Sequence, residues 1–90
     1  MNEKMFKATV ISTKIMHKVE KDYPKLLGIE FSFENLNRVV VCPTVITIFD
    51  NNGNFYHINY SPFKNKKEDL EEISDEVLVA LDHLYNFLKS

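Results

Sequence analysis

The sequence predicts an α+β domain in which a four-stranded antiparallel meander sheet packs against a C-terminal α-helix. Two observations carry this prediction. Runs rich in β-branched and aromatic residues alternate with turn signals before residue 64, and apolar residues recur at helical spacing after it. The chain of 90 residues is expected to form one domain, 1–90, with a modest core. The sheet is either open or strongly curled, approaching a small open barrel.

Two strands are expected in the first third of the chain. The first lies within residues 5–13, where Phe6, Ala8 and Val10 alternate inward. The basic connection over 15–25 has no decisive pattern. The second strand alternates an apolar face with a small or acidic one: Leu27, Ile29, Phe31 and Phe33 against Gly28, Glu30, Ser32 and Glu34.

A long apolar run over residues 38–49 predicts the third strand, bent or bulged at Pro43, which lacks a ladder donor. Its inward residues share one parity: Val39, Val41, Pro43, Val45, Thr47 and Phe49. Its other face is also apolar, with Val40, Cys42, Ile46 and Ile48. A strand that is apolar on both faces needs cover on both.

Asn52-Gly53, between two β-rich runs, predicts a tight hairpin into a fourth strand. A two-residue turn there places Phe49 opposite Tyr56 and Thr47 opposite Ile58. The stretch "FDNNGNF" does not predict a calcium loop, because the sixth and twelfth positions counted from Asp50 are Phe55 and Ser61.

The helix is predicted from apolar residues three and four apart: Leu70, Ile73, Val77, Leu81, Leu84 and Leu88. Two starts are possible. Asn65 with Glu68 resembles a capping box, and Ser74 follows Ile73, which could form a hydrophobic staple with Leu78. The helix is therefore either continuous from about residue 65 or broken near Ser74.

Catalytic and metal-binding motifs are missing from the sequence. The three histidines and the single Cys42 show no metal-ligand spacing, and no Gly-rich phosphate loop or nucleophile elbow occurs. Cys42 and His57 share a predicted face, but a mid-strand cysteine is usually inert packing. We expect neither an enzyme nor a cofactor.

The expected cellular location also follows from features that the sequence lacks. No apolar run approaches the length of a membrane span or a signal peptide, and a lone cysteine fits a reducing compartment. The sequence predicts a cytoplasmic protein that does not bind membranes.

Two surfaces are candidates for binding a protein. The acidic stretch "EDLEEISDE" places Glu68, Glu72, Asp75 and Glu76 on one helix face, where they could imitate a row of phosphates. The second sheet face, with Ile46, Ile48, Phe55 and His57, needs cover from the 15–25 connection, a second copy of the chain or another partner. We favour the last two over complete intrachain cover.

The favoured hypothesis is a small non-enzymatic interaction protein, a regulator or inhibitor that binds a protein partner or forms a homodimer. A bias of ten Lys to one Arg, with abundant Asn, is typical of an AT-rich genome, such as that of a low-GC bacterium or one of its phages. Together with the small size and the missing catalytic motifs, this bias suggests a phage or mobile element as the source. The alternative is a single-strand nucleic-acid-binding module. It would use lysines of the N-terminal region, where six Lys face three acids: Lys7, Lys14, Lys18 and Lys21 are the candidates.

Overall fold

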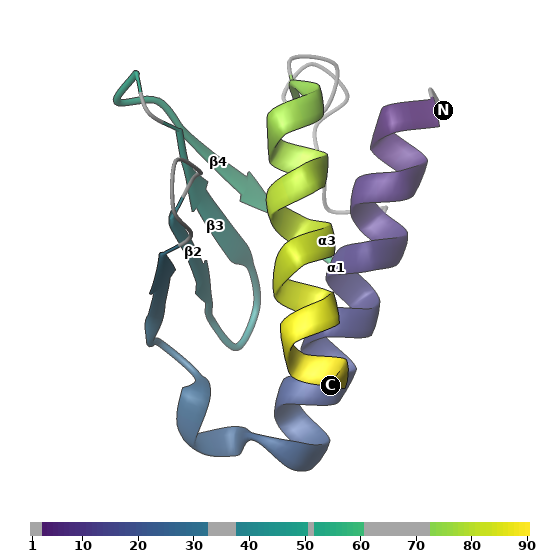
Figure 1. The fold of residues 1–90 in the computed structure, drawn as a ribbon, viewed down its shortest axis with the longest axis vertical. Coiled ribbons are helices and arrows are strands. Elements are labelled where there is room, and N and C mark those ends of the chain that lie inside the picture. Colours follow the sequence, from purple (N-terminus) through teal and green to yellow (C-terminus); the bar gives the residue numbers. More distant parts are fainter. Residues whose placement is uncertain (1–2, 33–37, 51, 61–72) are drawn as a thin grey trace.

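The computed structural model describes residues 3–32, 38–50, 52–60 and 73–90, which form a layer of helices beside a sheet (Figure 1). The elements are α1 (Glu3–Asp22), the 3₁₀ helix η1 (Pro24–Leu26), β1 (Glu30–Ser32), β2 (Arg38–Val41), β3 (Ile46–Phe49), β4 (Phe55–Ile58) and α3 (Asp75–Lys89). Each strand pairs antiparallel with the next, in the order β1-β2-β3-β4. The predicted α+β meander with a C-terminal helix is confirmed, and the sheet is open rather than closed.

The N-terminal segment is a helix, so the strand predicted within residues 5–13 is wrong. The buried side chains of α1 recur at helical spacing: Ala8, Thr9, Ser12, Ile15, Met16 and Val19. The local run Thr9–Ile11 favours a strand, but β-propensity spans only about 1 kcal/mol. Burying a stripe several turns long outweighs it. The helix ends before Tyr23, which precedes a proline and therefore avoids helical dihedrals.

Pro43 lies in a turn, so the single bent strand predicted over 38–49 is also wrong. The amide of Cys42 donates to the carbonyl of Val45 at 2.9 Å and closes a short connection between β2 and β3. Proline suits a turn because its φ is preset and it has no N–H to leave unpaired. The reversal pairs odd residues of β2 with even residues of β3, for example Val39 with Ile48.

The turn predicted at Asn52-Gly53 is confirmed, but the predicted register is off by one residue. Phe49 pairs with Phe55, and Ile46 pairs with Ile58. The cause is Asp50, whose Oδ1 accepts the amides of Asn52 and Asn54 at 2.9 and 2.8 Å. This carboxylate stabilises a connection one residue longer than a two-residue turn, with Gly53 at φ +85°.

Both helices cover the same face of the sheet, and the core fills the space between the layers. It consists of apolar side chains from α1, α3, the three strands β2–β4 and Ile73. Ser74 occupies the N-cap position of α3 in extended conformation, and its carbonyl accepts the amide of Val77 at 3.1 Å, so the later of the two predicted helix starts is confirmed. The earlier one, at Asn65 and Glu68, lies outside the described residues. No helix among those described combines the length and hydropathy of a membrane span.

Candidate functional site

The face of the sheet turned away from the helices carries two rows of side chains that cross all four strands. The register places Glu30, Val40, Thr47 and His57 in one row, and Ser32, Arg38, Phe49 and Phe55 in the next. Within the described part of the chain, both helices lie on the opposite side of the sheet (Figure 1). We call these residues the outer face.

The aromatic rings on the outer face form a continuous line of contacts. The guanidinium carbon of Arg38 lies 5.0 Å from the ring centroid of Phe49, and Phe49 is 6.3 Å from Phe55. Phe55 in turn meets the ring of His57 edge-on, with centroids 5.2 Å apart at an angle of 65°. Such cross-strand and same-strand contacts hold the rings in place on the sheet.

Polar contacts extend this line of side chains at both of its ends, at His57 and at Arg38. Thr47 Oγ1 lies 3.0 Å from His57 Nδ1, and Arg38 Nη1 lies 3.5 Å from Glu30 Oε1. Thr47 is 8% exposed, whereas Phe55 is 60% exposed. The outer face is thus a connected layer of side chains in which Phe55 is a large apolar group exposed to solvent.

The structure separates the four sheet residues predicted to contact a partner. Phe55 and His57 are exposed on the outer face. Ile46 and Ile48 are fully buried on the inner face, so their predicted place on an outward surface is wrong. The error comes from the turn at Pro43, which reverses the parity of β3. Recognising Pro43 as a turn residue would have placed Thr47 and Phe49 outward instead.

The acidic face predicted near the start of α3 is only partly described. Glu68 and Glu72 lie outside the described residues. Asp75 and Glu76 are exposed in the first turn of α3, where the positive end of the helix dipole favours acidic side chains. Asp75 Oδ1 forms an ion pair with Lys4 Nζ at 3.3 Å, which links the first turns of α3 and α1.

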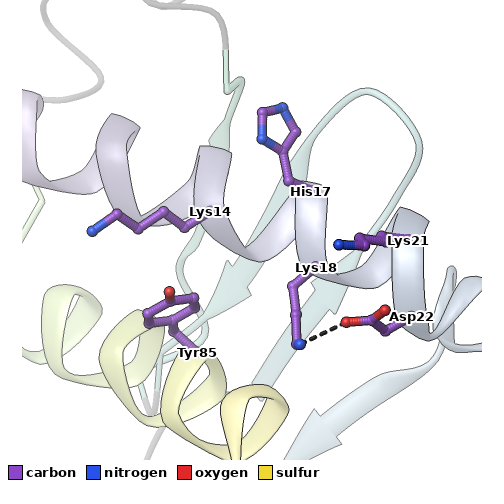
Figure 2. A pocket seen from close by; sticks show the side chains of 6 residues that line it. All are labelled: Lys14, His17, Lys18, Lys21, Asp22 and Tyr85. Carbon is purple, nitrogen blue, oxygen red and sulfur yellow. Dashed lines mark ion pairs between the residues drawn. The ribbon is translucent and has the colours of Figure 1, made fainter.

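The four candidate lysines lie on α1 rather than on a strand and its connection. Lys7 pairs with Glu3 at 3.1 Å, one helical turn away. Three others line an open hollow of about 290 Å³ between α1 and α3, which is formed by Lys14, His17, Lys18, Lys21, Asp22 and Tyr85 (Figure 2). The 14, 17, 18, 21 spacing is itself helical and would have grouped His17 with the lysines.

The hollow contains one ion pair, between Lys18 and Asp22 (Figure 2). The hydrogen bond between the two side chains raises the pKa of Lys18 and lowers the pKa of Asp22. Beside this pair, Lys14 Nζ lies 5.8 Å from the ring centroid of Tyr85, and Lys89 Nζ lies 5.7 Å from it. Tyr85 and Lys89 had no place in the predicted nucleic-acid site.

In the described part of the chain, His, Cys, Asp and Glu side chains form no group of three that could hold a metal ion. No protein-family model matches the sequence, and searches of curated proteins and of solved structures also find no match. The function is therefore inferred from the two surfaces themselves.

Proposed function

We propose that the chain is a small non-enzymatic interaction protein, a regulator or inhibitor that binds a protein partner through the outer face. The observation that carries the proposal is Phe55, a large apolar side chain that is 60% exposed and lies between Phe49 and His57 in a line of ring contacts. Phe55 adjoins the half-buried Phe49, and apolar side chains that adjoin one another at the surface of a small domain are typical of interaction sites.

The composition of the outer face supports a protein partner. Aromatic residues and arginine are enriched at the centres of protein interfaces and dominate their binding energy. Here Arg38 stacks over Phe49 and Phe49 contacts Phe55, so these side chains are already ordered before a partner arrives. Ordering them beforehand reduces the entropy lost on binding.

Charge also favours a protein over a nucleic acid on this face. The outer face carries one arginine and one glutamate, Arg38 and Glu30, which pair with each other. Single-strand binders combine stacking rings with a basic groove that follows the phosphates. The lysines of α1 lie in the other layer, behind the core (Figure 1). Among the described residues of the outer face, Arg38 is therefore the basic side chain that a strand stacked on Phe55 would meet. The partner we expect offers an apolar pocket for Phe55 and a carboxylate for Arg38.

The chain offers a matched control for this proposal. Phe6 is also 60% exposed, but it lies on α1, in the other layer. Tagged wild-type protein, Phe55→Ala and Phe6→Ala would each be used as bait in lysate of the natural host, with and without nuclease treatment. Partners recovered would be identified by mass spectrometry, purified and titrated against the three proteins. Sedimentation of each protein alone would detect a second copy as the partner.

We expect Phe55→Ala to weaken the complex at least tenfold, since truncating a central aromatic residue at an interface costs about 2 kcal/mol or more. Phe6→Ala should leave affinity within about twofold of wild type. The same contrast in a dimerisation constant would identify the partner as a second copy of the chain. Equal losses for both variants, or binding that disappears with nuclease, would overturn the proposal.

A further inference from the structure

We infer that the hollow between α1 and α3 is a binding site for a phosphate-bearing ligand, a nucleotide or a nucleotide unit of a single strand. This inference does not depend on the outer face, because the hollow lies in the helix layer on the other side of the core. It rests on the arrangement of charge, on the aromatic ring and on the size of the hollow.

Positive charge is concentrated in the hollow. Lys14, Lys18 and Lys21 line it against a single acid, Asp22. Like charges three and four residues apart repel each other along a helix face, and an anion bound between them relieves the repulsion. A cluster of this kind on one side of a domain with a net charge of −2 is a local reversal of the overall charge.

The lysines differ in how far they are neutralised. Lys18 is bound by Asp22. Across the described ranges, no carboxylate lies at ion-pair distance from Lys14 or Lys21. Figure 2 shows Lys14 extending past the Tyr85 ring while Lys18 turns toward Asp22. Two ammonium groups are therefore available to phosphate oxygens, for which lysine serves as a strong point charge.

Tyr85 favours a ligand that carries a ring as well as a phosphate. Its half-buried side chain forms the α3 side of the hollow, and Lys89 of the same helix also lies close to its ring. Aromatic rings beside lysines are the common elements of sites that stack a base and hold its phosphate. The open hollow of about 290 Å³ lies just below the size range of ligand pockets, which starts at roughly 300 Å³. A single nucleotide unit fits this size class.

The test compares two variants with the same loss of charge. Lys14→Gln/Lys21→Gln removes the two lysines of the hollow that have no carboxylate partner among the described residues. Lys7→Gln/Lys25→Gln removes two exposed lysines that do not line it. Wild type and both variants would be titrated at low salt with adenosine triphosphate and with a twelve-nucleotide oligothymidylate. Side-chain resonances of His17 and Tyr85 would report binding at the hollow, and circular dichroism would verify the fold.

We expect at least one probe to shift the His17 and Tyr85 resonances of the wild type. Its affinity should fall about tenfold in the hollow variant, because two charge-assisted contacts are lost, and less than about twofold in the control. Saturation by adenosine triphosphate identifies a free nucleotide as the ligand, and saturation by the oligonucleotide alone identifies a strand. The inference fails if neither probe shifts these resonances, or if both variants weaken binding equally. A failure would leave the Phe55 proposal untouched, since that proposal is measured on other residues.

Discussion

Thr47 and His57 lie directly opposite each other on β3 and β4, with Thr47 Oγ1 3.0 Å from His57 Nδ1. This pair shows which way β3 faces. With Thr47 turned outward to meet His57, its neighbours Ile46 and Ile48 must point at the helices, because successive side chains of a strand alternate between its faces. Both isoleucines are fully buried there.

The orientation of β3 is testable with two identical substitutions. Ile48→Ala should lower the free energy of unfolding by about 2–5 kcal/mol, because it opens a cavity in the core. Ile29→Ala, at a position that is 46% exposed, should change it by about 1 kcal/mol or less. Urea unfolding measures both. Similar losses for the two variants would contradict the observed orientation of β3.

The β3–β4 connection should make stability depend on pH through Asp50. Although desolvation acts to raise the pKa of Asp50, hydrogen bonds from Asn54, Asn52 and Tyr56 outweigh it and lower that pKa below the ordinary value of 3.8. A carboxyl with a lowered folded pKa stabilises the fold above its unfolded pKa, and this contribution is lost as pH falls through the folded pKa.

Asp50→Asn should therefore lose stability at neutral pH and show a flatter decline in acid than the wild type. Thermal unfolding followed from neutral pH to below pH 3.8 would measure this. Asp82→Asn, at an exposed position of α3, serves as the control. If the acid decline of Asp50→Asn parallels that of the wild type and the control, the carboxylate does not carry the expected pH dependence.

Removing the charge of Asp22 should strengthen the binding of a phosphate-bearing probe, whereas removing lysines of the hollow should weaken it. Asp22→Asn removes the carboxylate that neutralises Lys18 and adds one unit to the local positive charge. A phosphate-bearing probe should then bind several-fold more tightly, and the gain should shrink as added salt screens the charges. Titrations at two salt concentrations measure this. Weaker binding to Asp22→Asn would mean that Asp22 itself contacts the ligand or positions Lys18 for it.

Ser12 is the expected site of a stabilising change. Its hydroxyl is fully buried in α1, and no donor or acceptor among the described residues pairs with its Oγ. A buried polar group without a partner is destabilising, so Ser12→Ala should raise the free energy of unfolding by about 1 kcal/mol. Ser32→Ala, on the exposed outer face, should leave it nearly unchanged. A loss of stability on Ser12→Ala would show that the hydroxyl has an unrecognised partner.

The candidate surfaces were only partly visible in the sequence. The sequence predicted Phe55 and His57 on one outward face because β4 alternates cleanly, and the structure keeps them together. It assigned them the wrong neighbours on β3. When both faces of a strand are apolar, the alternation of residues does not show which face is buried. The lysines were recognised as a group, but pairing them with Tyr85 needs the packing of α3 against α1, which joins residues about 70 positions apart.

The sequence by itself determined the α+β class, an antiparallel meander, the turn at Asn52-Gly53 and a C-terminal helix for which Ser74 was one of two possible starts. These features depend on local chemistry: glycine at positive φ, period-two alternation and helix-cap preferences. The predicted total of four strands agrees with the structure only because one predicted strand is a helix and another is two strands.

Only the tertiary structure decided that residues 3–22 form a helix and that Ile46 and Ile48 are buried. For residues 3–22, local β-propensity is small, and the free energy gained by burying an apolar stripe between two layers exceeds it. For Ile46 and Ile48, the run is apolar on both faces, so the turn at Pro43 and the helices on one side of the sheet decide which face is buried.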